Sequence, residues 1–381
     1  MTPVEGLQVD IMPAQLEDWL RDYYFTNEID ISSSGVESFS LADIRALTGL
    51  SIETLDAIVF RDSPSYGQMR LRKAIAQRWG NDDPEHVMAT NGSSEAIFLV
   101  MNALLRAGDE VVVLDPAYHA LGSIAKALGC RLVPWHLSEE EGFSPDLTLL
   151  SKLLTSHTRM VIVNFPHNPT GASLTTRQQE DLLHAVENVG AYLVWDAAFA
   201  EIVYEHSPLP DPTRHYGRAI SFGTLSKAYG LSGLRVGWCV APPEVLKRCM
   251  HLRDYITLAL SPLVEMIAAH VVEHGDLILE RRLTQARLNL TIVALWMDRH
   301  AGFLDWTAPR GGVTVFPRLH TISDVDAFCH RLLREHSVLL VPGSCFGRPQ
   351  HVRLGFGGST ASLQQGLARL STALLSNGHR R

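Results

Sequence analysis

The sequence predicts an α/β protein built around a mainly parallel sheet, with a smaller α+β domain after it. Three observations support this fold class. Short runs of β-branched and apolar residues recur between residues 86 and 241, helical patterns separate most of them, and a long uninterrupted helical pattern follows. Because parallel strands need crossover connections, this alternation indicates a sheet that is covered by helices on both faces.

The N-terminal part begins with a short amphipathic helix at residues 14–25 and a short strand that runs into a polar turn at 29–35. Further helices are predicted at 69–79 and 93–108, and Gly108 is the expected C-cap of the second. The strands of the sheet are predicted at residues 86–90, 110–115, 131–135, 159–165, 191–196, 219–223 and 235–241.

The helical pattern at residues 277–301 has no internal glycine or proline and leads into the smaller domain. That domain is predicted to contain strands at 311–319, 338–342 and 351–356 and helices at 323–336 and 360–376. We therefore expect residues 1–60 to join the small domain, residues 61–290 to form the large domain, and residues 291–381 to form the small one.

Composition favours a well-packed cytoplasmic protein. Hydrophobic residues make up 46% of the 381 residues and charged residues 19%, which is typical of globular α/β proteins. The net charge of −8 disfavours nucleic acid as a partner. No apolar stretch approaches the roughly 20 residues of a membrane span, and no signal peptide is expected. The five cysteines have no metal-ligand spacing, so no metal site is expected.

The segment 221–238 carries the strongest functional pattern. A strand ends in a segment rich in Gly, Ser and Thr that presents Lys227, and Arg235 follows within Gly-Leu-Arg-Val-Gly. Most lysines are solvated surface residues, so Lys227 alone would indicate little. The combination is far more specific, and it favours a functional lysine.

Three further segments place polar side chains where predicted strands end. Asp196 closes an apolar run, Asn168 lies in an Asn-Pro-Thr-Gly turn, and Ser93 and Ser94 open a helix. A buried carboxylate is costly unless it is paired, and a helix start can bind an anion. Each also has a plainer interpretation: a helix cap for Asp196, an N-cap at Asn91 or Ser93 for the helix start, and an ordinary turn for Asn168.

Together these segments resemble the fold type I pyridoxal-phosphate enzymes, in the aminotransferase class I/II branch, over nearly the whole chain. The resemblance implies an aspartate aminotransferase-like fold with a seven-stranded sheet, pyridoxal 5'-phosphate as cofactor, and a homodimer. It implies that Lys227 holds the cofactor as a Schiff base, that Asp196 pairs with the ring nitrogen and that Asn168 bonds the ring hydroxyl. The residues that it implies for the phosphate are Ser93, Ser94, Thr224 and Arg235.

The same resemblance implies four further roles. Tyr118 would stack on the cofactor ring, and Tyr66 would reach the phosphate in the partner subunit. Arg353 would bind the substrate α-carboxylate, for which a bidentate guanidinium is suited, and Gly35 would close over the substrate. The plainer interpretations are core packing for Tyr118, a loop residue for Tyr66 and a surface arginine for Arg353.

Phe199 departs from the aminotransferase pattern. Typical members read Asp-x-Ala-Tyr, whereas this chain reads Asp-Ala-Ala-Phe at residues 196–199. One hydrogen bond to the ring hydroxyl is therefore missing, an effect of about 1 kcal/mol. The substitution weakens the prediction of a plain transaminase, although a Tyr-to-Phe exchange can also be accommodated without a change of reaction.

The segments LEDWLRDYYF, IDISSSGV, FRDSPS and PAYHAL, with those above, resemble the hydroxyarginine cyclases of capreomycidine and streptolidine biosynthesis. That resemblance implies a β-hydroxylated arginine as substrate, which loses its hydroxyl and is closed by its own guanidine. Two alternatives are an aminotransferase that uses 2-oxoglutarate and a non-catalytic protein that senses pyridoxal phosphate. The second is disfavoured because such regulators carry a basic DNA-binding module, whereas residues 1–60 hold 11 acidic residues against two arginines.

The sequence leaves two details of the site open. The guanidine needs an acceptor, which we expect from the N-terminal segment without being able to choose among its acidic residues. His119 and His167 flank the matched positions and are candidates to assist departure of the hydroxide. Each is more often a structural residue, so neither is assigned to catalysis.

Overall fold

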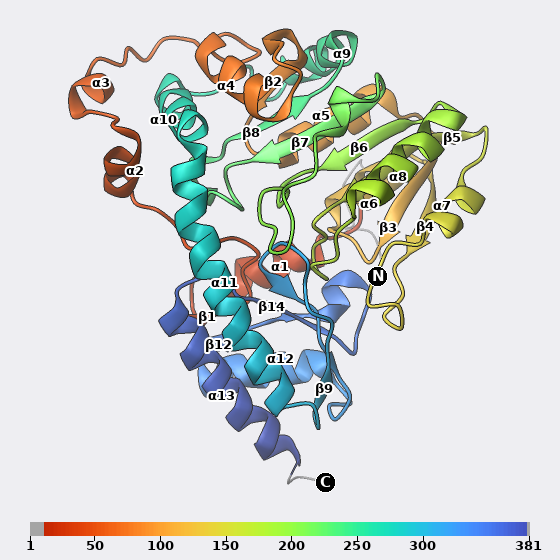
Figure 1. Cartoon of the computed structure of the whole chain (residues 1–381), viewed down its shortest axis with the longest axis vertical. Helices are drawn as coiled ribbons and strands as arrows, with labels where there is room; N and C mark the ends of the chain where they lie inside the picture. Colours follow the sequence, from red (N-terminus) through yellow and green to blue (C-terminus); the bar gives the residue numbers. More distant parts are fainter. Residues whose placement is uncertain (1–10, 379–381) are drawn as a thin grey trace.

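A computed structural model describes residues 11–378 and contains the predicted sheet (Figure 1). All of its strands run in one direction except β8, which is antiparallel to both of its neighbours. The strands in spatial order are β2 (Val87–Thr90), β8 (Gly237–Val240), β7 (Ala219–Thr224), β6 (Tyr192–Asp196), β5 (Thr158–Asn164), β3 (Glu110–Asp115) and β4 (Arg131–His136). The predicted fold class, with its seven-stranded and mainly parallel sheet, is confirmed.

Helices cover both faces of this sheet. Strand β5 shows why, because its alternating residues enter two different cores: Val161 and Val163 belong to one buried cluster, and Met160 and Ile162 belong to the other. The first core includes residues of α4 (Met69–Trp79), α8 (Thr176–Val189) and α10 (Pro262–Glu273), and α7 (Leu147–Leu153) packs beside α8. The second includes residues of α5 (Ser93–Leu104), α6 (Ala120–Ala127) and α9 (Pro243–Arg253).

The smaller domain lies at the other end of α11 (Gly275–Arg299), the long helix that runs between the two domains in Figure 1. Strand β1 pairs in parallel with β12, which brings the N-terminal segment into this domain. Its elements are α12 (Val325–His336), α13 (Thr360–Gly378), β9 (Leu304–Asp305), β10 (Thr314–Val315), β11 (Arg318–Leu319), β12 (Val338–Leu339), β13 (Val341–Pro342) and β14 (Val352–Gly355). The N-terminal segment contains α1 (Gln15–Tyr23) and β1 (Ile29–Asp30), and then α2 (Leu41–Thr48) and α3 (Ile52–Asp56), which lie beside α10 at the other end of the molecule (Figure 1).

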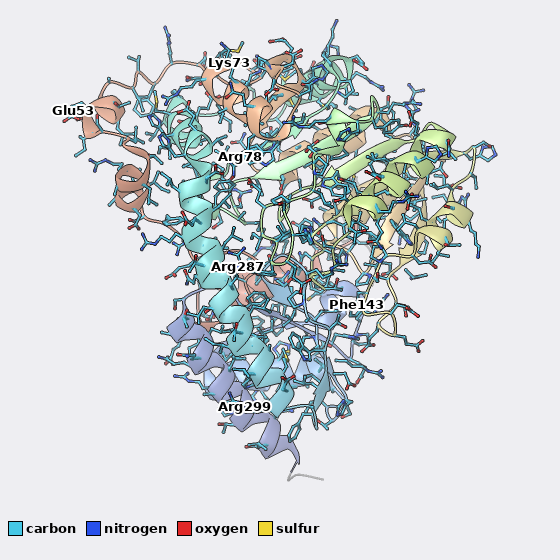
Figure 2. The ribbon with its side chains drawn as sticks, in the orientation of Figure 1. Glu53, Lys73, Arg78, Phe143, Arg287 and Arg299 are labelled. Atoms are coloured by element: carbon cyan, nitrogen blue, oxygen red, sulfur yellow. The ribbon has the colours of Figure 1, made fainter. Side chains whose placement is uncertain are left out.

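Aromatic side chains join the two domains beside the sheet. Figure 2 labels Phe143, which lies in the connection between β4 and α7 of the large domain. Its ring packs at 6.2 Å from the rings of both Phe316 and His351 of the small domain. The strand ends of the large domain therefore face a packed surface of the small one, and the functional site lies at this junction.

Three local predictions are wrong. The strand predicted at 338–342 is divided into β12, which pairs with β1, and β13, which pairs with β14. The helix predicted at 93–108 ends at Leu104, because Leu105 is extended (φ −98°, ψ 151°), and Gly108 is not its C-cap. Gly108 instead lies in a loop with φ 88°, where its N–H donates to Gly129. The strand predicted at 311–319 is divided into β10 and β11, since Pro317 has no N–H with which to continue a ladder.

Leu193 of β6 tests the sheet's core, because its side chain is 0% exposed at the centre of the sheet. We predict that Leu193→Ala lowers the free energy of unfolding by about 3–5 kcal/mol, since it removes apolar contacts and leaves a cavity. The measurement is urea unfolding of the apoprotein. Leu288→Ala on α11, where Leu288 is 54% exposed, is the control and should stay within about 0.5 kcal/mol of the parent. Equal losses in the two variants would contradict this account of the core.

Candidate active site

A cavity of about 480 Å³ lies where the strand ends of the large domain meet the small domain. This volume is in the range of small-molecule and cofactor sites. The structure brings into its lining most of the residues that the sequence singled out: Ser93, Ser94, Tyr118, Asn168, Asp196, Phe199, Thr224, Lys227, Arg235 and Arg353. Tyr66 and Gly35 lie outside the lining.

The parallel strands explain why these residues meet. Asn164, Asp196 and Thr224 are the last residues of β5, β6 and β7, and parallel neighbours end at the same edge of a sheet. Asn164 is paired in register with Asp196 and donates from Nδ2 to its carbonyl at 2.9 Å. The Asn164 Oδ1 also accepts from the Asn168 N–H at 2.9 Å, which holds the following turn against the strand end.

Lys227, which is half-buried, and Asp196, which is buried, are ionisable groups of opposite charge on this edge. Burial raises the pKa of Asp196 to about 6, although the Ala198 N–H, which donates to Oδ1 at 3.0 Å, and the charge of Lys227 act against the rise. Burial and then the charge of Arg353 lower the pKa of Lys227 to about 8. The lowered pKa increases the neutral, nucleophilic share of the Lys227 amine, and a cationic ring nitrogen would keep the Asp196 carboxylate ionised.

The start of α5 forms a cradle for an anion. Gly92 precedes the helix with φ 75° and no side-chain cap, so the cap that the sequence offered as the plainer interpretation is absent from this helix start. A Cβ on Gly92 would overlap the guanidinium of Arg235, and a Cβ on Gly237 would overlap the Ser93 amide. These glycines let β8 and Arg235 approach the helix N-terminus, where free N–H groups and a cation favour a phosphate.

Arg235 itself has an uncommon backbone conformation, with φ 54° and ψ 45° in the left-handed region. Its Nη1 donates to the Ser232 carbonyl at 3.1 Å, which directs the guanidinium toward the cradle. Thr224 Oγ1 lies beside it, donating to the Val236 carbonyl at 3.0 Å and accepting from the Ser226 N–H at 3.1 Å. The local chain thus holds a cation and hydroxyl groups beside the α5 start.

Arg353 of β14 is the small domain's contribution to the cavity and is only 1% exposed. Nη1 donates to Asn168 Oδ1 at 3.2 Å and Nη2 to the Ser32 carbonyl at 3.0 Å, so it is not the surface arginine of the plainer interpretation. Its Nε is buried without a hydrogen-bond partner among the described residues. Burial lowers its pKa to about 10. A buried cation with an unsatisfied donor fits a carboxylate ligand.

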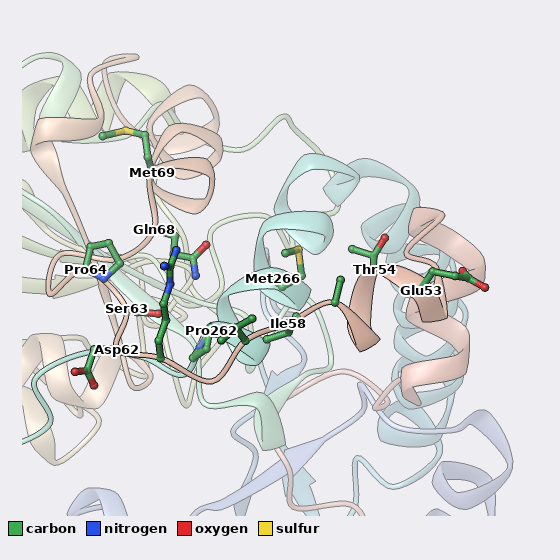
Figure 3. A pocket seen from close by; sticks show the side chains of 13 residues that line it. Glu53, Thr54, Ile58, Asp62, Ser63, Pro64, Gln68, Met69, Pro262 and Met266 are labelled. Carbon is green, nitrogen blue, oxygen red and sulfur yellow. The ribbon is translucent and has the colours of Figure 1, made fainter.

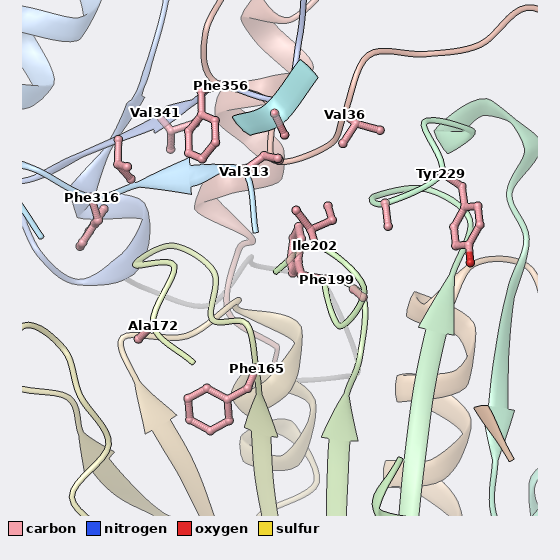
Figure 4. Packing of buried hydrophobic residues seen from close by; sticks show 14 of the residues in the cluster. Val36, Phe165, Ala172, Phe199, Ile202, Tyr229, Val313, Phe316, Val341 and Phe356 are labelled. Carbon is pink, nitrogen blue, oxygen red and sulfur yellow. The ribbon is translucent and has the colours of Figure 1, made fainter. Parts of the chain in front are cut away.

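Two aromatic side chains form walls of the cavity: Tyr118 carries a hydroxyl, and Phe199 has no hydrogen-bond donor. The Tyr118 hydroxyl donates to Glu17 Oε1 at 3.1 Å, and burial raises the pKa of this phenol. Phe199 is 4% exposed and lies near Ile202, between the strand ends and Val313 of the small domain (Figure 4). Phe199 is therefore packed into the core that borders the cavity, and it offers no hydroxyl to a ligand.

Tyr66 and Gly35 have different surroundings from the other predicted residues. Tyr66 is half-buried, and the Arg72 guanidinium lies 5.5 Å from its ring centroid. Gly35 packs against the backbone next to Lys227, since a Cβ on Gly35 would be 3.3 Å from the Ser226 carbonyl oxygen. Their predicted roles toward the partner subunit and the substrate stay predictions.

The sequence did not single out several of the lining residues, among them Glu17, Ser34 and Asn164. Ser34 is 6% exposed and accepts from Lys227 Nζ at 3.0 Å. Asn164 was findable, since it ends a predicted strand four residues before Asn168. Glu17 and Ser34 gave no local signal, because the pairing of β1 with β12 is what carries their segment to the cavity.

Of the two histidines left open by the sequence, His167 has structural surroundings. His167 is 1% exposed, with Nδ1 2.8 Å from Thr170 Oγ1 and Nε2 2.8 Å from the Pro116 carbonyl oxygen. Burial lowers its pKa to about 4, so it is neutral. His119 lies outside the cavity lining. Across residues 11–378 there is no group of three or more His, Cys, Asp or Glu side chains placed to hold a metal ion, and no helix that could span a membrane.

The residues present fit pyridoxal phosphate. The α5 cradle with Arg235 suits the phosphate, and the buried Asp196 suits a protonated ring nitrogen. The buried amine of Lys227, with its lowered pKa, suits a bond to an aldehyde, while Arg353 remains for a substrate carboxylate.

Comparisons with known proteins agree with this site. Residues 56–370 match the family model of aminotransferase class I and II. The chain is 48% identical over 377 residues to capreomycidine synthase from Streptomyces vinaceus, covering 98% of this chain and 97% of that one. It is 42% identical to the PLP-dependent cyclase OrfR, whose crystal structure superposes with a TM-score of 0.93 over 98% and 100% of the two chains. A variant of aspartate aminotransferase from Thermus thermophilus, at 23% identity, shares the fold with a TM-score of 0.84 over 97% and 100%.

The charges around Lys227 give a pH prediction. Because only the neutral amine attacks an aldehyde, the rate at which Lys227 in the apoprotein reacts with a small aldehyde should be half-maximal near pH 8. Arg353 lowers the pKa of Lys227 and Asp196 raises it. Arg353→Met should therefore move the midpoint to higher pH, and Asp196→Asn should move it to lower pH. Rates followed by mass spectrometry across pH check this, and shifts of the same sign in both variants would contradict it.

Proposed function

This chain belongs to the aminotransferase class I and II family, and from that membership we propose that it is a pyridoxal-phosphate-dependent cyclase of a β-hydroxylated arginine. The observation that carries the proposal is that a capreomycidine synthase and a PLP-dependent cyclase each align with 98% of this chain. The similarity therefore includes both the catalytic edge of the sheet and the N-terminal segment that lines the cavity. The product would be a capreomycidine- or streptolidine-type cyclic amino acid for antibiotic biosynthesis.

Residues of the large domain would hold the cofactor. We assign Lys227 to its covalent attachment, Asp196 to the ring nitrogen and Asn168 to the ring hydroxyl. Tyr118 would cover one face of the ring. The phosphate would be bound at the α5 cradle by Ser93, Ser94, Thr224 and Arg235. When bound, pyridoxal phosphate withdraws electrons from the substrate and so acidifies its Cα–H bond.

Arg353 and Lys227 would then act on the substrate. Arg353 binds the α-carboxylate, and its neighbour Asn168 fixes the guanidinium at 3.2 Å. Lys227 would be the general base that takes the Cα proton, since its lowered pKa of about 8 leaves a share of it neutral near pH 7. Asp196 keeps its charge beside the ring nitrogen and maintains the proton there. Lys227 returns a proton to Cα at the end.

The ring closure itself takes place within the substrate. The Cβ–O bond breaks, a guanidine nitrogen bonds to Cβ, and the hydroxyl leaves as water with the proton that the nitrogen loses. Because the nucleophile is tethered to the carbon that it attacks, it has a large effective concentration over external water or amines. No second amino acid or keto acid takes part.

This last property separates the proposal from its alternatives. An aminotransferase leaves the substrate's amino group on the cofactor and needs a keto acid such as 2-oxoglutarate to turn over again. A non-catalytic sensor would bind the cofactor and release no product. Phe199, which supplies no hydroxyl where aminotransferases have a tyrosine, favours the cyclase over the aminotransferase.

We predict that the holoenzyme converts β-hydroxyarginine to a cyclic product over many turnovers without any keto acid, as measured by mass spectrometry. Lys227→Ala should abolish this turnover, because it removes both the attachment point and the base. Lys73→Ala, on the surface of α4, is the control and should keep parental activity. A single turnover that resumes only when 2-oxoglutarate is added would establish the aminotransferase instead.

We also propose that the chain is a homodimer in which Tyr66 reaches the partner's phosphate site. A groove of about 1250 Å³ lies beside α3 and α10, on the segment that leads to Tyr66. Figure 3 shows side chains that line it. Exposed apolar side chains gather around it, among them Val59 at 71% and Phe60 at 75% exposure. A second copy of the chain would cover this surface.

The oligomeric state tests this surface. Phe60→Asp should shift the protein toward monomer in light scattering, because it places a charge in the proposed interface, and should weaken cofactor retention through loss of Tyr66's contact. Leu375→Asp, on the exposed side of α13 at 50% exposure, is the control and should leave the mass unchanged. A parental protein that is monomeric at working concentration would contradict the dimer.

A further inference from the structure

The cavity contains a carboxylate for which the roles assigned above have no use. Among the described residues of its lining, Glu17 and Asp196 are the acidic ones, and Lys227, Arg235 and Arg353 are the basic ones. Asp196 faces the ring nitrogen in the proposed function. Glu17 lies on α1, in the N-terminal segment, and needs a separate explanation.

Helix α1 holds Glu17 in a fixed place. Trp19, on the same helix, is 8% exposed and donates from Nε1 to the Leu340 carbonyl at 2.9 Å, which attaches the helix to the small domain. Leu16 and Leu20, one residue before and three residues after Glu17, also line the cavity. The helix therefore presents one carboxylate between two apolar side chains to the cavity.

Glu17 acts electrostatically on the groups that would handle the substrate. Its negative charge raises the pKa of Lys227 and of Arg353, although burial outweighs it in both. It also accepts the hydrogen bond from Tyr118, whose ring borders the same cavity. Glu17 thus lies close to the base, to the carboxylate-binding arginine and to the aromatic wall.

We propose that Glu17 binds the guanidinium group of the substrate and holds it toward the reacting carbon. This inference rests on the proposed function, because that function supplies the cationic side chain. The phosphate of the cofactor would neutralise the charge of Arg235, and the carboxylate of the substrate would neutralise that of Arg353. The protonated ring nitrogen would neutralise the charge of Asp196. Glu17 then remains as the charge in the cavity for a substrate cation, and a guanidinium suits a carboxylate through paired N–H donors.

A purely structural role explains less. If Glu17 served only as an acceptor for Tyr118, a neutral amide would suffice, and a half-buried carboxylate is costlier than an amide. A carboxylate has about four lone-pair sites, so the single bond from Tyr118 leaves capacity for further donors. The contact with Tyr118 places Glu17 beside the aromatic wall, where a guanidine folded back toward Cβ would lie.

The test uses the holoenzyme and two ligands that lack the β-hydroxyl, so that binding is measured without the elimination. L-arginine carries the guanidinium, and L-citrulline is its uncharged analogue of nearly equal shape. The change in cofactor absorbance on titration gives each Kd. The parental protein should prefer arginine, and Glu17→Gln should reduce this preference by about 10-fold or more, as expected for a lost hydrogen bond to a charged group.

Two variants complete the design. Asp18→Asn changes the next carboxylate on α1, which pairs with Arg21 at the surface, and should keep the preference. Tyr118→Phe removes the hydroxyl but leaves Glu17 charged, and it should also keep most of the preference. Cofactor absorbance per mole of protein verifies that each variant is folded and loaded.

An unchanged ratio of the two Kd values in Glu17→Gln would overturn the proposal, and so would an equal loss in Tyr118→Phe, which would make Glu17 a support for the tyrosine. Failure of the proposed function looks different. In that case arginine would still be preferred through Glu17, while β-hydroxyarginine would give no cyclic product without a keto acid.

Discussion

The burial of opposite charges at one edge of the sheet is the constraint on which the rest of this site depends. Asp196 is buried and Lys227 is half-buried, and desolvation shifts the pKa of each toward its neutral form. Such groups are stabilised only by partners placed close to them. A ligand that brings a cationic nitrogen to Asp196 and an aldehyde to Lys227 satisfies both requirements at once. The α5 cradle and Arg353 then bind the anionic groups at its periphery.

Much of this site could be predicted from the sequence, because in a parallel sheet a residue that ends a strand lies at a known edge of the sheet. Asp196 and Thr224 end apolar runs, and the ends of parallel strands share one edge, so their meeting follows from the fold class. The family resemblance added the roles of residues such as Arg353, whose surroundings a strand pattern alone could not reveal. The end of the helix at Leu104 was missed, since tertiary packing of the following loop, rather than Gly108, decides where it stops.

The N-terminal contribution could not be predicted for a physical reason. Glu17 and Ser34 reach the cavity because β1 pairs with β12 and because Trp19 attaches α1 to Leu340, contacts between parts of the chain that are distant in sequence. Neither residue differs locally from a solvated surface residue. With 11 acidic residues in the first 60, composition indicated that an acceptor was available but not which one. Only the folded arrangement distinguishes Glu17 from its neighbour Asp18.

The division of the site between two domains suggests how one fold serves different reactions. The large domain supplies Lys227, Asp196 and the phosphate cradle, which every substrate of such an enzyme needs. The small domain and the segment attached to it supply Arg353 and Glu17, which would contact the two ends of this particular substrate. Glu17, which would recognise the guanidinium of the substrate, also accepts a hydrogen bond from Tyr118 across the junction. Tyr118 belongs to the wall that would lie over the reacting carbon. A change of substrate therefore requires a change in α1 rather than in the sheet, and the catalytic edge can stay as it is.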